Sequence, residues 1–180
     1  TVLVLIMGYI FMNGLGKISW EFLFSEPESM GAEGGIFSII VGTIIFTLTT
    51  MILSVPIGAA AAVYLTEYTK KSYGARIIRF GIDALAGIPS IVFGLFGFAL
   101  FVTILKPVTG GWSLVSGALT GACMILPTII RTTEEAIKAV PNSYREGSCA
   151  LGATQWQTVI RIVIPTALPG IITGVILGIG

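Results

Sequence analysis

Long runs without a charged residue constrain the fold of this chain more than any other feature of its sequence. Five such runs cover residues 1–16, 34–66, 84–105, 107–130 and 162–180. Several exceed the roughly 18 apolar residues that are typical of a transmembrane helix. We therefore expect an all-α membrane protein, a polytopic helical bundle of about five spans that forms one transmembrane domain over residues 1–180.

The composition supports a lipid environment and argues against other classes of protein. Of the 180 residues, 54% are hydrophobic and 11% are charged, whereas soluble domains carry roughly 25% charged residues. A net charge of +1 argues against nucleic acid as a partner, because binding to a phosphate backbone needs a concentrated basic surface. With no histidine and only two distant cysteines, Cys123 and Cys149, we expect neither a metal site nor a disulfide framework.

The basic residues predict the orientation in the membrane, since those near span ends remain in the cytoplasm. Eight of the ten fall in two segments that would share one side: Lys70, Lys71, Arg76, Arg79, Arg131, Lys138, Arg145 and Arg161. We therefore expect a cytoplasmic N-terminus and a cytoplasmic loop over residues 132–164. The first run has no basic leader or cleavage site, so we do not expect a signal peptide. Because two of the runs reach the ends of the sequence, we expect a piece of a longer membrane protein.

The second run is too long for one straight membrane crossing. As one helix, residues 34–66 would extend about 50 Å, against a hydrocarbon core of about 30 Å. Pro56 and Gly58 predict a kink, so we expect one long bent helix that continues into the cytoplasm. The alternative is two half-helices with an interrupted backbone near the midplane, where transporters often bind substrate.

Glycines recur every four residues in the last two runs. Gly170, Gly174 and Gly178 share one face of the fifth run, and Gly117 and Gly121 share one face of the fourth. This spacing lets two helix backbones approach closely, which is how helices associate in lipid. We expect these glycines to mark helix–helix contacts.

The polar loop reads as short helices separated by helix breakers. Thr132 or Thr133 is suited to cap a first helix, which residues 140–142 would end. Three further signals mark helix ends: Ser143 with Glu146 as a capping box, Gly152 as a terminus, and Thr154 with Gln157 as a second capping box. We therefore expect two short helices joined by a glycine corner.

Small residues fill the middle of this loop: Gly147, Ser148, Cys149, Ala150 and Ala153. Such a surface fits closely into a groove on another protein, with Leu151 and Trp156 as apolar anchors. An amphipathic linker that lies at the membrane surface accounts for the same residues equally well.

The spacing of the loop resembles the EAA loop of ABC importer permeases. That signature is Glu, two small residues that are usually Ala, three residues of any kind, Gly, nine of any kind, then Ile-x-Leu-Pro. Here Glu146 opens the pattern, Gly152 follows six residues later, and residues 162–165 close it with Pro165. Gly147 and Ser148 stand at the two Ala positions and Ile164 at the Leu position, so the residues remain small or aliphatic.

Longer stretches resemble the PstA type of phosphate importer permease subunit, with the paralogous PstC type close to it. These are "GIPSIVFGLFGFALFV", "LPTIIRTTEEAIKAVPNSYREGSCALGATQWQTV" and "IPTALPGIITGVILGIG", and the resemblance covers nearly all of residues 34–180. It implies a type I (MetI-like) permease fold and a chain that forms the pathway for phosphate across a prokaryotic inner membrane. The chain would be no enzyme and bind no cofactor, because ATP and Mg belong to a partner ATPase.

The resemblance also implies partners and a coupling site. ABC ATPase subunits, a second permease subunit and an extracytoplasmic phosphate-binding protein would complete the importer. The EAA loop supplies the coupling helix that docks in the ATPase. Carried over to this chain, that site comprises Glu146, Gly147, Ser148, Leu151, Gly152, Trp156 and Pro165.

A phosphate path needs cations or hydrogen-bond donors in the spans. Arg131 is the best cation for this, with Glu134 one turn on to hold or release it, although a basic anchor at the cytoplasmic interface explains Arg131 as well. Thr128 and Thr49 would add hydroxyl donors, unless they only bond to the preceding turn.

Three other functions stay open. The first is a permease for another oxyanion or the PstC-type subunit. The second is a membrane scaffold that recruits a cytoplasmic protein without transport. An intramembrane hydrolase is the weakest alternative, because neither cysteine has a base beside it in the sequence.

Overall fold

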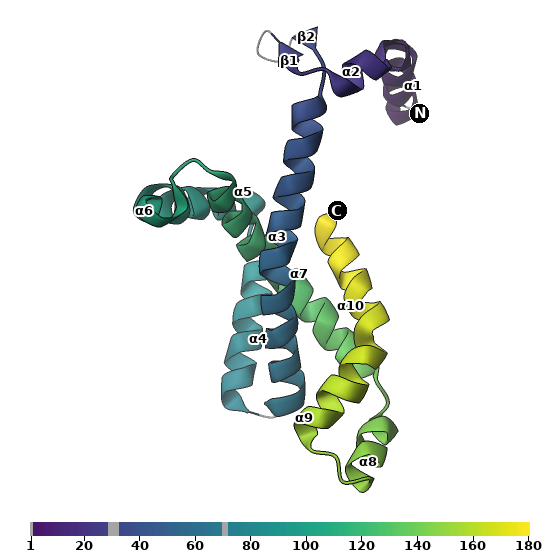
Figure 1. Cartoon of the computed structure of the whole chain (residues 1–180), viewed down its shortest axis with the longest axis vertical. Helices are drawn as coiled ribbons and strands as arrows, with labels where there is room; N and C mark the ends of the chain where they lie inside the picture. The colour runs from purple at the N-terminus through teal and green to yellow at the C-terminus, as the bar shows by residue number, and fades with distance from the viewer. Residues whose placement is uncertain (1, 29–32, 70–71) are drawn as a thin grey trace. The chain divides into compact units, whose positions relative to one another are not determined.

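The computed structural model describes residues 2–28, 33–69 and 72–180, and it is built almost wholly of helices (Figure 1). The chain divides into two compact units, residues 1–45 and 46–180, and the single transmembrane domain predicted over 1–180 stays a prediction. Lys70 and Lys71, which contribute to the predicted orientation, lie outside the described residues.

The first unit contains the apolar start of the chain. The first run forms α1 (Val2–Gly14), followed by a 3-10 turn (Leu15–Lys17) and by α2 (Trp20–Phe24). The side chain of Ser19 caps α2 by accepting a hydrogen bond from the N–H of Phe22. Two short strands, β1 (Pro27–Glu28) and β2 (Glu33–Gly34), then pair antiparallel.

The second unit carries the remaining helices. They are the part of α3 (Phe37–Val63) from residue 46 on, then α4 (Tyr73–Ala86), α5 (Ser90–Gly97), α6 (Lys106–Thr109), α7 (Leu114–Ala139), α8 (Asn142–Ala150), α9 (Gln155–Thr158) and α10 (Ile164–Ile179). Three π-helical turns extend or join them: Tyr64–Tyr68 after α3, Phe98–Ile104 after α5, and Val159–Val163 between α9 and α10.

Three helices among the described residues are long and apolar enough to cross a membrane: Phe37–Tyr68, Leu114–Ala139 and Gln155–Ile179. A fourth crossing results if Tyr73–Ala86 and Ser90–Ile104, bent by 101° at their break, form one span. The predicted all-α polytopic membrane fold is therefore confirmed, with three or four candidate spans among the described residues against the about five predicted. The span boundaries differ from the charge-free runs, because a charged residue marks the edge of the lipid and does not by itself end a helix.

The second run forms one continuous helix rather than two half-helices. Pro56 lies inside α3, which continues without a break through the π-helical turn to Tyr68. At 32 residues it extends about 48 Å, using the rise of 1.5 Å per residue, so it exceeds the thickness of the hydrocarbon core. The prediction of a single long helix is confirmed.

The glycines of the fifth run mark close contacts between α10 and α7. A Cβ placed on Gly170 would lie 2.7 Å from the Cβ of Ala136, and one on Gly174 would collide with the Thr132 side chain, both on α7. A Cβ on Gly178 would lie 3.1 Å from the Cδ1 of Ile129. The glycines therefore let α10 approach α7 more closely than any side chain allows, as their spacing predicts.

The fourth run uses its glycines in the same way against α3. A Cβ on Gly117 would lie 3.2 Å from the Phe46 ring, and one on Gly121 would lie 3.2 Å from the Cγ2 of Thr50. Helix α7 thus faces α3 with its own glycines and meets the glycines of α10 on another side. It also contacts α4 and α5, so it is central to the second unit.

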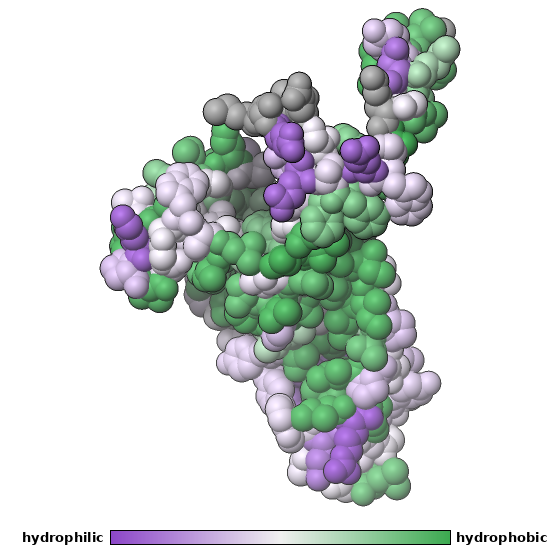
Figure 2. Space-filling view, turned by 45° about the horizontal axis from the view of Figure 1, so that its top comes forward, coloured by the Kyte–Doolittle hydropathy of each residue, from purple (hydrophilic) through white to green (hydrophobic). Residues whose placement is uncertain are grey.

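Two small clusters of buried apolar residues lie at the end of this unit where α8 is found. One joins α3, α4 and α7, and the other joins α7 and α10: Ala62, Leu65, Ala75, Ile82 and Ile130 in the first, and Ile137, Val140, Val163, Ala167 and Ile171 in the second. Most other large apolar side chains of this unit are exposed. Figure 2 shows this apolar surface giving way to hydrophilic residues at the lower end of the view. An apolar exterior with a polar end is the surface of a protein immersed in lipid.

Candidate functional site

A sharp corner joins α8 to α9 at one end of the second unit (Figure 1). Gly152 adopts a left-handed backbone with φ 81°. Its N–H donates to the carbonyl of Cys149 at 2.9 Å, and the N–H of Ala153 donates to the carbonyl of Ser148 at 3.2 Å. This pair of hydrogen bonds is the Schellman motif, which favours glycine at the left-handed position. The predicted glycine terminus is therefore confirmed.

The second helix of the corner begins at the predicted capping box. The Thr154 hydroxyl accepts from the N–H of Gln157 at 3.3 Å, and the Gln157 side-chain oxygen accepts from the N–H of Thr154 at 2.9 Å. A buried hydrogen bond of 2.8 Å joins the hydroxyls of Ser148 on α8 and Thr158 on α9. The hydrogen bonds at Gly152 thus fix the turn, and the Ser148–Thr158 hydrogen bond joins the two helices directly.

The first predicted capping box is wrong. Helix α8 already begins at Asn142, directly after Pro141, and no side chain caps it. Pro141 has φ −57° and ψ 139°, an extended residue that turns directly into the helix, so Ser143 lies inside the first turn. Glu146 therefore does not complete a cap, and its side chain is exposed.

The predicted helix start at Thr132 or Thr133 is also wrong. Helix α7 runs without a break from Leu114 to Ala139. The hydroxyl of Thr132 bonds back to the carbonyl of Thr128 at 2.9 Å, as in a helix interior, and Thr133 is buried. The predicted stop at residues 140–142 is confirmed, because the fourth span simply continues to that point.

Most residues of the predicted coupling site lie on an uncovered surface. Leu151 is 91% exposed and Trp156 is 62% exposed, although both are large apolar side chains. Leu151 also lines a hollow of about 430 Å³, together with residues that include Tyr144, Gly147 and Ser148. Apolar side chains at a polar end of a molecule are typical anchors for another protein.

Pro165 closes the EAA pattern in the sequence, but it does not end a helix in the structure. It lies in the first turn of α10, and the helix continues through it to Ile179. The π-helical turn Val159–Val163 directly precedes α10. A wider turn accommodates a residue that has no N–H to donate to the preceding turn, so α9 and the last span form one rod.

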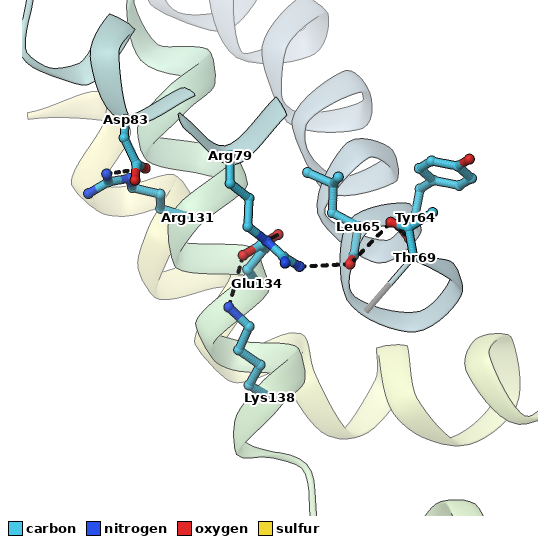
Figure 3. A network of polar contacts seen from close by, with 8 residues as sticks. All are labelled: Tyr64, Leu65, Thr69, Arg79, Asp83, Arg131, Glu134 and Lys138. Carbon is cyan, nitrogen blue, oxygen red and sulfur yellow. Dashed lines mark hydrogen bonds and ion pairs between the residues drawn. The ribbon is translucent and has the colours of Figure 1, made fainter. Parts of the chain in front are cut away.

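A network of ion pairs surrounds the buried carboxylate of Glu134 (Figure 3). Arg79 on α4 donates to one of its oxygens at 3.1 Å, and Lys138 donates to the other at 2.9 Å. Arg79 also donates to the carbonyl of Leu65 at 2.7 Å. The carboxylate thereby links α4 to α7, and Arg79 links both to the end of α3.

Arg131 is paired with a different acid from the one predicted. Its guanidinium forms an ion pair with Asp83 on α4, while Glu134 points toward Arg79 and Lys138 (Figure 3). Both members of the Arg131–Asp83 pair are about half exposed, at 49% and 55%. The predicted pairing of Arg131 with Glu134 is wrong, because α4, far away in sequence, supplies a nearer partner for each.

These charged side chains line a pocket of about 310 Å³ between α4 and α7, together with Ile82, Ile130 and Glu135. Thr128 and Thr49, the two predicted hydroxyl donors, are not among its lining residues. Thr128 is exposed on α7, and Thr49 is partly buried on α3. The structure therefore brings Arg131 and Glu134 to one pocket and leaves both threonines outside it.

A buried ion pair that the sequence analysis did not single out joins α8 to the end of α3. Arg145 donates to the carboxylate of Glu67 at 2.8 Å and 3.1 Å, and the side chains are only 15% and 5% exposed. In the sequence Arg145 counts only as one of several basic residues of a cytoplasmic loop. No local signal indicates a partner 78 residues away.

Comparison with known proteins places this arrangement in a family. Residues 54–180 match the family described as "Binding-protein-dependent transport system inner membrane component". The probable ABC transporter permease protein YqgI of Bacillus subtilis is 37% identical, over 99% of this chain and 60% of its own length. The phosphate transport system permease protein PstA of Pasteurella multocida is 35% identical, over 93% of this chain and 58% of its own length.

The fold agrees with these similarities. Inward-facing structures of the MetNI methionine ABC transporter superpose on 81% of this chain and 66% of the matched chain, with a TM-score of 0.62 and 20% identity. The predicted MetI-like fold and the resemblance to PstA-type permeases are confirmed. The chain spans about 60% of the length of the curated relatives it matches.

The matched residues contain both features described above, the α8–Gly152–α9 corner and the pocket around Glu134. They cover the greater part of the chain, from the middle of α3 to its last residue. The chain belongs to the family of binding-protein-dependent transport system inner membrane components.

Proposed function

We propose that the chain is part of a permease subunit of an ATP-driven importer for inorganic phosphate. The observation that carries the proposal is the corner of α8 and α9, which presents Leu151 and Trp156 to solvent beyond the ends of the apolar helices. A two-helix element that is braced by its own hydrogen bonds is suited to receive the motion of a partner and pass it to the spans as a rigid body.

The partner in this proposal is a cytoplasmic ABC ATPase, which binds ATP and Mg and hydrolyses the nucleotide. The corner then faces the cytoplasm of a prokaryotic cell whose inner membrane holds the apolar helices. A second permease subunit completes the pathway, and an external binding protein delivers the substrate. The chain itself carries no step of bond chemistry in this account.

Phosphate is supported as the substrate by the relatives named PstA and by the pocket around Glu134. Arg131 is the cation best placed to bind an anion there, because its pair with Asp83 is half exposed and can exchange. Glu134 is held by Arg79 and Lys138, so it does not compete for Arg131. Thr49 and Thr128 do not line this pocket, so as hydroxyl donors they would act at another point of the phosphate path.

Reconstitution tests the proposal. The full-length subunit, its permease partner and the ATPase are placed in liposomes with the binding protein, and uptake of phosphate, sulfate, molybdate and phosphonate is compared. Phosphate alone is expected to enter and to stimulate ATP hydrolysis. Uptake of another oxyanion in its place would replace the substrate, and the absence of any uptake with normal binding of the ATPase would favour a scaffold.

Replacing Arg131 by glutamine is expected to abolish phosphate uptake while the complex still assembles. The amide cannot replace the positive charge that binds the anion, and the exposed Arg131–Asp83 pair contributes little to stability. Radiolabelled phosphate uptake and copurification of the ATPase are measured on the same preparation. Arg76→Gln, the same change at an exposed position of α4, is the control that should transport normally, and uptake at the control rate by Arg131→Gln would refute the role.

A further inference from the structure

The Arg145 side chain leaves the exposed surface of α8 and enters the interior. Besides Glu67, its guanidinium donates to the carbonyl of Val140 at 2.7 Å, to the carbonyl of Ile137 at 2.9 Å and to the Asn142 side-chain oxygen at 3.3 Å. The two carbonyls belong to the C-terminal end of α7, where helix carbonyls have no partners within the helix and where a cation is favoured. Arg145 therefore connects α8, the end of α7 and Glu67 in one group.

Glu67 is held from a second direction. Its backbone carbonyl accepts a hydrogen bond of 3.0 Å from the side chain of Gln155, the first residue of α9. Glu67 belongs to the π-helical turn that ends the long helix α3. The end of this span is thus bound by both helices of the corner, α8 through the Glu67 carboxylate and α9 through the Glu67 carbonyl.

The geometry makes this contact stiff. A guanidinium that donates two hydrogen bonds to one carboxylate oxygen at 2.8 Å and 3.1 Å has its orientation set by the plane of the fork. Both side chains are largely removed from water, so separating them takes an opposite charge away from each ion in a poorly solvated place, which is costly. Such a pair is more effective at fixing one arrangement of two elements than at adding stability, because apolar residues of similar size can stabilise a fold equally well.

We propose that the Glu67–Arg145 pair makes the corner and α3 move as one body, with Arg145 as a positioning residue for transport. The inference rests on the proposed function, in which the corner receives motion from an ATPase. Helix α7 and α10 are attached to the corner through the chain, but α3 is 78 residues away from Arg145 in sequence. The end of α3 is therefore joined to the corner by side-chain contacts, among them this buried ion pair and the hydrogen bond from Gln155.

Transport measurements test the proposal with variants that avoid a lone buried charge. Glu67→Gln with Arg145→Gln removes both charges together and keeps polar side chains of similar length at both positions. We expect the double variant to hydrolyse ATP within about twofold of the parent while maximal phosphate uptake falls about tenfold, a typical size for coupling between two sites. Half-saturation by phosphate should stay unchanged. Arg145→Lys, which retains the charge but not the fork, should be intermediate.

The matched control is Arg161→Gln, the same substitution at an exposed position of the same loop region, which should leave both rates unchanged. A charge-swapped pair is unsuitable for this test, because a carboxylate at position 145 would be repelled by the carbonyl oxygens of Ile137 and Val140. A double variant with normal coupling, or one whose hydrolysis and uptake fall in parallel with a loss of folded protein, would show that the pair is only structural.

A distance measurement tests the connection without phosphate or ATPase. Both cysteines of this chain are free. With Cys123 and any cysteine elsewhere in the full-length protein replaced by serine, Cys149 on α8 carries one spin label, and Ile52→Cys, at a 71% exposed position of α3, carries the second. In the full-length protein in nanodiscs we expect one narrow distance distribution, kept in Arg161→Gln and broadened in the double glutamine variant. An unchanged width would overturn the inference, and broadening in a protein that imports another solute would overturn only the choice of substrate.

Discussion

Replacing Gly174 by leucine is expected to separate α10 from α7 and to lower the stability of the second unit by about 3 kcal/mol, near the upper end of the usual cost of overpacking. A Cβ at this position already collides with the Thr132 side chain, and Thr132 cannot move away easily because its hydroxyl bonds to the carbonyl of Thr128. The remaining leucine atoms then have no space between the two backbones.

The measurement is the thermal unfolding midpoint of the detergent-solubilised protein, followed by circular dichroism. Gly94→Leu is the matched control, because Gly94 also lies within a helix, α5, but no atom comes within 4 Å of a Cβ placed on it. The control should keep the parent midpoint or exceed it, since leucine favours a helix more than glycine does. Equal midpoints for the two variants would contradict the packing account of the glycine spacing.

Replacing Gly152 by valine is expected to uncouple the corner from its partner. The φ of 81° costs an ordinary L-residue about 1–2 kcal/mol and a β-branched residue more. The backbone would leave this conformation, lose the two hydrogen bonds from Gly152 and Ala153 to α8, and change the angle between α8 and α9. We expect the ATPase to be lost on purification and phosphate uptake to fall about tenfold or more, the usual range of a coupling free energy.

Two further variants separate geometry from chemistry in this prediction. Gly81→Ala is the control, because Gly81 lies within α4, outside the corner, with no atom within 4 Å of its Cβ position, so alanine should strengthen the helix by about 1 kcal/mol and leave coupling intact. Glu146→Ala removes an exposed carboxylate without changing the backbone, and it should weaken ATPase binding while the fold is kept. Copurification of the ATPase by the Gly152→Val protein at the parent level would exclude the corner as the docking site.

The corner is the part of the candidate site that could be predicted from the sequence. Gly152 and the Thr154–Gln157 capping box act through hydrogen bonds to residues within five positions of themselves, so their chemistry is local and visible in the spacing. The glycines of α10 could be read in the same way, because a four-residue repeat already specifies one face of a helix. Their partners on α7 could not be named in advance.

Helix ends were harder to predict where a charged residue suggests the end of a span but the following residues still favour a helix. Arg131 ends a charge-free run, but α7 continues two more turns to Ala139 because no glycine or proline interrupts it. Ser143 and Glu146 have the spacing of a cap, yet Pro141 starts the helix earlier. Local patterns identify possible helix ends, and the backbone selects among them according to what precedes and follows.

By itself, the sequence determined the membrane class, the close approach of the glycine faces and the turn between α8 and α9, since each depends on composition or on residues a few positions apart. Only the tertiary structure decided which acids Arg79, Arg131 and Arg145 meet, whereas Lys138 meets Glu134 one turn away on the same helix. Asp83 takes Arg131, Glu134 takes Arg79 and Lys138, and Glu67 takes Arg145. Most of these partners lie 48 to 78 residues apart in the sequence. A charge carries no information about such a partner until packing brings the two helices together.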